Sequence, residues 1–340
     1  MDIRDPAPVG PLAPASDTMR EAHAAFLDVA TLGQDIDLTP LLGACDVLTG
    51  FSRTAPEQVA LHAAQANVVI CNKTVLDDVA IAALPALELI LVTATGVDNV
   101  DLGAAALRGI AVCNCRDYGT AAVAQHTLAL MLALHVRLGD YAQRVRAGEW
   151  SRAEDFSLFD QPILELQGRT LGIFGNGAIG SEVARLAGAL GMQILFAQLP
   201  GRPARPDTLP WREVLACADV VSLHCPLTEG TRQLIDTEAL AAMKPGAFLL
   251  NTARGALVDE AALAQALREG RVGGAGIDVL GQEPPRDGSP LLAADLPNLI
   301  VTPHNAWASR QARQRLEQQS AENLLAWRRG EPVRNVVSGQ

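Results

Sequence analysis

Three side chains with complementary chemistry stand out in the second half of this chain. Arg254, Glu283 and His304 each lie three or four residues beyond the end of a short apolar run. Such runs are typical of buried parallel strands, and the loops after parallel strands share one edge of the sheet. A guanidinium can bind a carboxylate and polarise a carbonyl, and an imidazole can transfer a proton near neutral pH. The three residues predict a reaction centre for an alcohol or ketone that carries a carboxylate.

Glu283 is expected to act on His304 rather than on a substrate. A carboxylate beside an imidazole fixes its tautomer and favours its protonated form. Each residue alone also has an ordinary interpretation: an interdomain salt bridge for Arg254, a solvated loop carboxylate for Glu283 and a helix cap for His304. Their occurrence together at three strand ends favours the catalytic interpretation.

A glycine-rich turn, GNGAIG at residues 175–180, follows the apolar run 171–174. In the pattern G-x-G-x-x-G, the first glycine permits a tight turn, the second lets a pyrophosphate approach the backbone, and the third allows close packing of helix on strand. A helix predicted over 178–190 would direct its N–H groups at the phosphates. The chain has 29 glycines, so the pattern alone is weak evidence, and the alternative is a turn without a ligand. Its position between a strand and a helix favours a dinucleotide site.

The end of the next predicted strand bears on the choice of cofactor. A fingerprint for NAD usually has Asp or Glu about 20 residues beyond its first glycine, whereas here Gln198 is followed by Arg202 and Arg205. A neutral side chain with two nearby guanidinium groups favours a 2′-phosphate. Alternatively, both arginines face water and Gln198 bonds the ribose. NAD(H) and NADP(H) therefore both stay open.

Two strand ends in the first half carry further candidate contacts. Lys73 follows one apolar run, and Thr95, Gly96 and Val97 follow the next. Lys73 could hold a carboxylate as a point charge, and the amides around Gly96 could form a small anion nest. The alternatives are a solvated lysine and an ordinary turn.

The elements that must hold these residues alternate between strands and helices. The expected strands are 24–27, 47–48, 68–71, 87–92, 110–113, 171–174, 193–197, 220–223, 247–250, 276–279 and 299–301. The expected helices are 56–64, 77–84, 102–107, 118–136, 178–190, 211–216, 236–243, 259–268 and 310–328. This alternation predicts parallel sheets with helices on both faces. The last helix is expected to pack back on the first domain, which would make that domain discontinuous.

The long helix at 118–136 is apolar on most sides and is therefore expected to be buried between domains or subunits. Thr120 is its expected N-cap. His126 and His135 lie within it without partners at ligand spacing, so we interpret both as structural. The mixed, aromatic-bearing segment 137–163 is hypothesised to be an arm that covers a neighbouring subunit.

Composition limits the remaining possibilities. Hydrophobic residues make up 49% of the 340 residues and the net charge is −11, which argues against a nucleic-acid surface. Six scattered cysteines show no metal-binding spacing, so we expect no metal, buried thiols and a reducing, cytoplasmic location. Neither a membrane span nor a signal peptide is expected. The proline-rich segment 1–20 is expected to be a disordered tail.

The order of motifs is similar to that of a known family. The motifs are ATGVDNVD (94–101), YGTAAVAQH (118–126), GNGAIG (175–180), SLHCPLT (222–228), NTARG (251–255), GIDV (276–279), QEPP (282–285) and TPHNAWAS (302–309). This series resembles the D-isomer-specific 2-hydroxyacid dehydrogenases. Within that family it is most similar to the glycerate dehydrogenases, also called hydroxypyruvate or glyoxylate reductases.

The resemblance implies an α/β fold of two doubly wound parallel-sheet domains with a cleft between them. A flavodoxin-like substrate domain would comprise 21–119 and 305–340, and a Rossmann-type nucleotide domain 120–304. The implied reaction is hydride transfer between a nicotinamide cofactor, NAD(H) or NADP(H), and a small 2-keto or D-2-hydroxy acid. The family also implies a homodimer through Tyr118–Trp150.

The resemblance also assigns residues. It makes His304 the general acid/base, Glu283 its partner and Arg254 the substrate-binding arginine. The implied substrate contacts are Lys73, Thr95, Gly96, Val97 and Arg254. Trp307 is expected to border the same pocket. The cofactor contacts that it implies are Thr120, His224, Cys225, Pro226 and Asp278. The glycine turn and the strand ends add the candidate cofactor residues Gly175, Asn176, Gly177, Ala178, Ile179, Gly180, Gln198, Arg202, Thr252 and Ala253. Of these, Gln198 departs from the family, which usually has an acid there.

Other activities of the same fold stay open. A formate or phosphite dehydrogenase would oxidise a different small anion, although the formate enzymes of the family have glutamine beside the histidine where this chain has Glu283. A non-enzymatic, nucleotide-sensing corepressor-like module is a further alternative, which the set Arg254, Glu283 and His304 disfavours.

Overall fold

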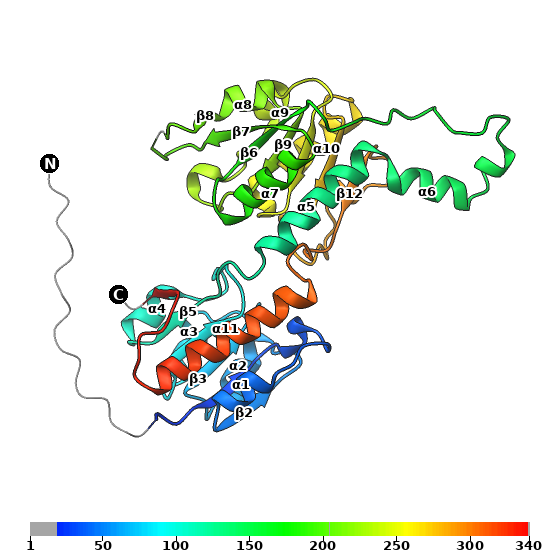
Figure 1. Ribbon diagram of the computed structural model, residues 1–340. Coiled ribbons are helices and arrows are strands. Elements are labelled where there is room, and N and C mark those ends of the chain that lie inside the picture. The colour runs from blue at the N-terminus through cyan, green and yellow to red at the C-terminus, as the bar shows by residue number, and fades with distance from the viewer. Residues whose placement is uncertain (1–18, 204, 339–340) are drawn as a thin grey trace, which may run out of the picture. The chain divides into compact units, whose positions relative to one another are not determined.

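The computed structural model describes residues 19–203 and 205–338, so residues 1–18 of the expected tail lie outside the described residues. The contacts divide the chain into two units (Figure 1). Unit 1 ends its first segment at Tyr118 and resumes at Arg310, and unit 2 is Gly119–Ser309. Arg20, at the end of the expected tail, belongs to the folded part of unit 1: its backbone N–H donates to Arg328 O at 2.8 Å and its guanidinium lies 5.3 Å from the Trp327 ring centre.

Unit 1 is built on a six-stranded sheet with the order β13-β5-β4-β3-β1-β2. Its strands are β1 (His23–Phe26), β2 (Val47–Gly50), β3 (Val68–Cys71), β4 (Leu89–Val92), β5 (Ala111–Cys113) and β13 (Val336–Ser338). All neighbours are parallel except β13, which pairs antiparallel with β5. The described helices are η1 (Val29–Leu32), α1 (Thr39–Ala44), η2 (Pro56–Gln58), α2 (Val59–His62), α3 (Asp78–Ala82), α4 (Leu102–Leu107) and α11 (Arg310–Arg328).

The central strands of unit 1 are apolar throughout because both faces of the sheet are covered. Every residue of β3 and β4 is buried, as expected for a parallel sheet between helical layers. The helix α11 packs against α1, and its Glu317 accepts a hydrogen bond from Leu41 N at 2.8 Å in a buried setting. The C-terminal segment therefore completes the core of unit 1.

Unit 2 contains a seven-stranded sheet with the order β12-β11-β10-β9-β6-β7-β8. Its strands are β6 (Thr170–Phe174), β7 (Gln193–Gln198), β8 (Thr208–Pro210), β9 (Val220–Leu223), β10 (Phe248–Asn251), β11 (Gly274–Ile277) and β12 (Leu299–Val301). All pairs are parallel. Strand order reverses between β6 and β9, which is where doubly wound sheets bind ligands.

Most helices of unit 2 lie on both sides of this sheet, whereas the helix Leu138–Arg146 extends away from it (Figure 1). The helices of this unit are α5 (Thr120–His135), α6 (Leu138–Arg146), η3 (Trp150–Arg152), α7 (Ala178–Ala189), α8 (Trp211–Cys217), η4 (Glu229–Thr231), α9 (Thr237–Ala242), η5 (Gly255–Leu257), α10 (Glu260–Arg268) and η6 (Pro290–Leu292). The predicted parallel α/β fold is confirmed, and every expected strand is present within two residues of its predicted ends. The short edge strands β8 and β13 were not predicted.

The helices differ from the sequence analysis in one expectation that is wrong and in one helix that was not predicted. Gly119, not Thr120, is the N-cap of α5, because the chain already has helical geometry at Thr120. The segment 137–163, for which no helix was predicted, contains α6, which follows a sharp turn at Arg137 (φ 52°). Among the described residues, no single helix is both long and apolar enough to cross a membrane, although α5 and α6 together, bent by 60°, meet those criteria.

Candidate active site

The glycine turn between β6 and α7 has the geometry that a dinucleotide requires. Gly175 has φ +114°, and a side chain there would lie 2.6 Å from His224 O. A side chain at Gly180 would overlap the carbonyl of Gly175, whereas one at Gly177 would meet nothing within 4 Å. Close packing therefore requires glycine at positions 175 and 180, whereas Gly177 leaves space in front of the N-terminus of α7. This space and the free N–H groups of the helix fit a pyrophosphate.

The loop after β9 forms a neutral wall beside this turn. Ser222 Oγ lies 2.8 Å from His224 Nε2. Desolvation lowers the pKa of the His224 imidazole to about 4, and burial raises the pKa of the Cys225 thiol to about 11. Both side chains are therefore uncharged near neutral pH. The contacts predicted for His224, Cys225 and Pro226 would be apolar or hydrogen-bonded rather than ionic.

The end of β7 lacks the carboxylate that usually binds an adenosine ribose. Gln198 Nε2 donates to Arg202 O at 3.3 Å, and Arg205 Nε lies 3.4 Å from Asp207 Oδ1. The Arg202 side chain is exposed and has no ion pair within the described part of the chain. Arg205 is therefore already paired, and Arg202 is the cation that could face a 2′-phosphate.

The loop after β10 is held by the side chain of Asn251. Asn251 Nδ2 donates to Arg254 O at 2.8 Å, and Ala253 N donates to Asn251 Oδ1 at 3.0 Å. A side chain at Gly255 would overlap the Leu280 carbonyl, so the loops after β10 and β11 touch through their backbones. This contact brings the segments that carry Arg254 and Glu283 together, as the sequence predicts.

Two further predicted cofactor residues lie close to these loops. Thr252 Oγ1 is 3.1 Å from Thr127 Oγ1, which ties the loop after β10 to α5. The hydroxyl of Thr120, in the first turn of α5, is buried without a hydrogen-bond partner among the described residues. An unsatisfied buried hydroxyl is costly, so Thr120 could bond a ligand there.

Glu283 and His304 form a direct pair. Glu283 Oε2 lies 2.5 Å from His304 Nδ1, and Glu283 Oε1 accepts from Leu280 N at 2.8 Å. The carboxylate keeps a proton on Nδ1, which leaves Nε2 as the nitrogen available to a reactant. The side chains are 27% and 34% exposed for His304 and Glu283, so the pair is accessible. The predicted acid–imidazole geometry is therefore present.

The segment that carries His304 is anchored on the buried carboxylate of Asp278, which is 1% exposed. Asn305 N donates to Asp278 Oδ1 and Ala306 N to Asp278 Oδ2, each at 3.0 Å. Trp307 Nε1 donates to His304 O at 3.0 Å. The loop of His304 is thus hydrogen-bonded by Asp278, which was predicted to contact the cofactor, and by the indole of Trp307, which was predicted to contact the substrate.

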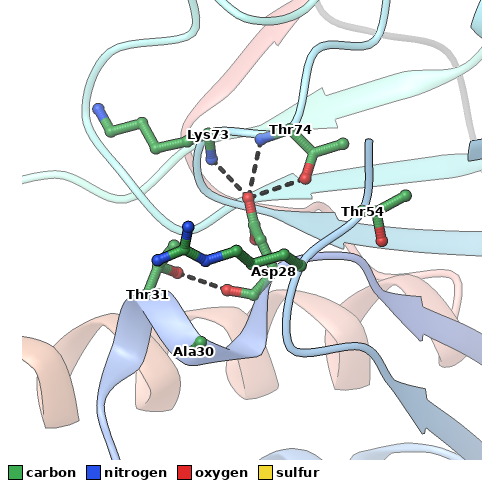
Figure 2. Close-up of a pocket in the computed structure, with 7 residues that line it drawn as sticks. Asp28, Ala30, Thr31, Thr54, Lys73 and Thr74 are labelled. Carbon is green, nitrogen blue, oxygen red and sulfur yellow. Dashed lines mark hydrogen bonds between the residues drawn. The ribbon is translucent and has the colours of Figure 1, made fainter. Parts of the chain in front are cut away.

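Lys73 lies on the wall of a cavity of about 310 Å³ in unit 1 (Figure 2). The cavity is lined by Asp28, Ala30, Thr31, Arg53, Thr54, Lys73 and Thr74, at the carboxyl ends of β1, β2 and β3. Figure 2 shows the Lys73 amine directed away from Asp28, whose carboxylate binds the Lys73 and Thr74 amides. Asp28 was missed by sequence reasoning; its only signal was an acid directly after an apolar strand.

Thr95, Gly96 and Val97 follow β4, at the same edge of the unit 1 sheet. Thr95 Oγ1 donates to Cys115 O at 3.0 Å, and Asn114 Nδ2 donates to Thr95 O at 2.7 Å. These bonds fix the start of the loop. The predicted substrate contacts thus fall into two groups, with Lys73 and this loop in unit 1 and Arg254 and Trp307 in unit 2.

Known proteins resemble the chain over most of its length. Residues 128–306 match the family model of the D-isomer specific 2-hydroxyacid dehydrogenase, NAD binding domain. A glycerate dehydrogenase of Methylorubrum extorquens is 46% identical over 286 residues, covering 84% of this chain and 90% of the relative. A hydroxypyruvate reductase of Blautia hydrogenotrophica is 38% identical over 301 residues, covering 87% and 92%.

Solved structures share the fold as well. The NADPH-dependent glyoxylate/hydroxypyruvate reductase from Sinorhizobium meliloti, solved in complex with citrate, superposes with a TM-score of 0.79. It is 30% identical, and the match covers 93% of this chain and 98% of that one. The similarity thus includes both units.

Proposed function

The chain belongs to the D-isomer-specific 2-hydroxyacid dehydrogenases, and we propose that it reduces hydroxypyruvate and glyoxylate to D-glycerate and glycolate. It is an oxidoreductase that acts on the CH–OH group of donors with a nicotinamide cofactor. The relatives named glycerate dehydrogenase and hydroxypyruvate reductase support the choice of substrate. The observation that carries the chemistry is the 2.5 Å contact between Glu283 and His304.

The proposed proton path uses the free nitrogen of His304. In the reductive direction, Nε2 of protonated His304 gives its proton to the carbonyl oxygen of the keto acid, while Glu283 stabilises the imidazolium through Nδ1. Arg254 would bind the substrate carboxylate and polarise the carbonyl. A bound nicotinamide nucleotide supplies the hydride.

The residues proposed to hold the cofactor are the glycine turn 175–180, the wall 224–226 and the end of β7. We propose that Arg202 lets the enzyme accept NADPH as well as NADH, because Gln198 is neutral where the usual carboxylate would repel a 2′-phosphate. Arg202→Ala should raise the KM for NADPH about tenfold and leave that for NADH unchanged. A strong preference for NADH that Arg202→Ala does not alter would contradict this part of the proposal.

In unit 1, Lys73 and the amides of Thr95, Gly96 and Val97 are the proposed partners of the substrate carboxylate or its neighbouring groups. Their support is their position after adjacent strands β3 and β4. Trp307 is proposed to border the substrate, and its bond to His304 O would fix the indole there.

We also propose a homodimer through the region Tyr118–Trp150. Large apolar side chains are exposed in this region and just after it, namely Leu132, Val136, Leu138, Val145, Trp150, Phe156, Phe159 and Ile163. Clusters of exposed apolar residues mark protein interfaces. Light scattering should give twice the 35.8 kDa chain mass, and a monomer would refute the interface.

All six cysteines are free, which supports the proposed cytoplasmic location.

The decisive test is turnover of a substrate panel with both cofactors. Hydroxypyruvate and glyoxylate should oxidise NADH or NADPH faster than pyruvate or bulkier keto acids, and formate should reduce neither NAD nor NADP. Chiral analysis of the glycerate product should give the D-isomer. Activity with formate and none with any keto acid would overturn the proposal, as would nucleotide-dependent protein binding without turnover.

A further inference from the structure

A chain of side chains connects the loop of His304 to α5. Thr302 Oγ1 lies 2.5 Å from Asp278 Oδ1 and 3.1 Å from His126 Nε2. His126 Nε2 is itself 3.6 Å from Asp278 Oδ1. The ends of β11 and β12 and the second turn of α5 therefore meet at the hydroxyl of Thr302.

The direction of these hydrogen bonds follows from the number of protons. An ionised carboxylate can only accept, so the single hydroxyl proton of Thr302 lies in the short bond to Asp278. The oxygen of Thr302 can then only accept from His126. His126 must carry a proton on Nε2, and the chain runs from His126 through Thr302 to Asp278.

Asp278 in turn fixes an uncommon backbone conformation at His304. His304 has φ +50°, in the left-handed region, which is unfavourable for a residue with a Cβ. Its N–H donates to Asp278 O at 2.8 Å, and the two following amides donate to the Asp278 carboxylate. In this conformation the His304 ring faces Glu283. The left-handed turn thus depends on where the Asp278 carboxylate is held.

We propose that His126 is a positioning residue for His304. By donating to Thr302, it keeps the Thr302 hydroxyl directed at Asp278 and so stabilises the turn that presents the imidazole. The inference rests on the proposed function, in which His304 transfers the proton. It goes beyond the expectation that His126 is merely structural. The sequence did not indicate this partner because His126 and Thr302 are 176 residues apart.

Steady-state kinetics with hydroxypyruvate should separate positioning from packing. His126→Leu removes the donor and should lower kcat about fivefold, while KM and the cofactor Kd change less than about twofold. His126→Gln should restore kcat, because its amide can donate from a similar place. Thr302→Val should lower kcat about tenfold, and Thr302→Ser should restore it.

The double variant His126→Leu/Thr302→Val tests the coupling. If the two residues act through one chain, its kcat should equal that of Thr302→Val alone rather than the product of the two effects. The matched control is His62→Leu in unit 1, where His62 Nδ1 bonds Thr54 Oγ1 at 2.9 Å. It should lower the melting temperature without changing kcat.

Four outcomes of these measurements on variants would overturn the proposal. They are equal loss of kcat in His126→Leu and His126→Gln, multiplicative effects in the double variant, the same loss of kcat in His62→Leu, or weaker cofactor binding instead of slower turnover. Because Gln and Ser retain the hydrogen bonds, these variants keep the test informative should Thr302→Val fail to fold.

An NMR measurement distinguishes failure of this inference from failure of the proposed function. Long-range ¹H–¹⁵N spectra of the imidazoles should show a proton on Nε2 of neutral His126, and His126→Leu should shift the His304 signals. If His126 has no proton on Nε2 and His126→Leu leaves the His304 signals unchanged, the inference is overturned, even where the wild-type enzyme turns over keto acids. Their presence in a protein without turnover supports the hydrogen-bonded chain and refutes only the proposed function.

Discussion

Asp28 in unit 1 and Asp278 in unit 2 are buried carboxylates that capture loops in the same way. Asp28 accepts the amides of Asn72, Lys73 and Thr74 at 2.7–3.1 Å and the Thr74 hydroxyl at 3.0 Å. Asp278 accepts two amides and the Thr302 hydroxyl. In each unit, a carboxylate at the end of one strand holds the loop that follows a neighbouring strand.

The two loops differ in what they fix. Around Asp28 the backbone is held, while the Lys73 side chain extends away from the carboxylate (Figure 2). Around Asp278 the backbone is held in a left-handed turn, and Glu283 fixes the direction of the His304 ring. A buried aspartate therefore suffices to fix the backbone of a loop. Proton transfer also needs a hydrogen bond that orients the reacting side chain, which Glu283 supplies to His304.

The largest expected effect comes from removing the side chain that the Asp278 loop presents. His304→Ala should lower kcat for hydroxypyruvate about a thousandfold, because it deletes the proposed general acid. Thermal unfolding should change little, since the ring is partly exposed. Stopped-flow absorbance of NAD(P)H gives the rate, and near-normal turnover would remove the functional distinction between the two loops.

Matched substitutions of the two aspartates test the comparison directly. Asp278→Asn should lower kcat about thirtyfold, since charge-assisted hydrogen bonds of this kind contribute about 2 kcal/mol. Asp28→Asn should cost a similar free energy of unfolding but change kcat only a few-fold. Denaturation curves give the free energy of unfolding of each variant, and steady-state kinetics give its kcat.

Equal losses of kcat in the two variants would contradict the comparison. Cofactor titrations add a second criterion, because Asp278 is also predicted to contact the cofactor. If Asp278→Asn weakens cofactor binding while kcat at saturation stays normal, Asp278 serves the cofactor and not the His304 loop.

The difference between the loops also explains how far the sequence could predict the site. The turn 175–180 was predictable because its geometry is encoded locally by glycines that lack side chains. Glu283 and His304 were found because each follows a predicted strand. Their mutual contact could be expected, since parallel strands end at one edge of a sheet, but the left-handed conformation of His304 could not.

What the sequence did not reveal depends on contacts between distant segments. Asp28 bonds a loop 44 to 46 residues away, and no local pattern marks an acid after a strand as a loop anchor. The strand β13 is three residues long and exists because β5 offers a free edge, which is a tertiary effect. Helix α6 was missed because its polar, short sequence resembles a loop.

A smaller effect is expected where the Asp28 loop presents its lysine. Lys73→Ala should raise the KM for hydroxypyruvate about tenfold and leave kcat nearly unchanged, because a flexible ammonium contributes binding more than orientation. Arg53→Ala, which changes another cation of the same cavity, is the matched control and should leave KM unchanged. A large drop in kcat for Lys73→Ala would show that the Asp28 loop also positions a reacting group.

The smallest expected effect on turnover concerns a third buried carboxylate, Glu317. Within the described part of the chain it accepts from a single backbone amide, Leu41 N, and from Gln314 Nε2. Burial raises its pKa from 4.5 to about 7, so the folded protein holds this proton more tightly than the unfolded chain. The stability due to Glu317 is therefore full below pH 4.5 and is lost as the pH rises through about 7, by up to about 3 kcal/mol. Glu317→Gln should remove this part of the pH dependence of the melting temperature without changing kcat. If the melting temperature of Glu317→Gln falls with pH in parallel with that of the wild type between pH 5 and 8, the Glu317 proton does not contribute to this pH dependence. Its few donors would then stabilise the ionised carboxylate as well as the donors of Asp28 and Asp278 do.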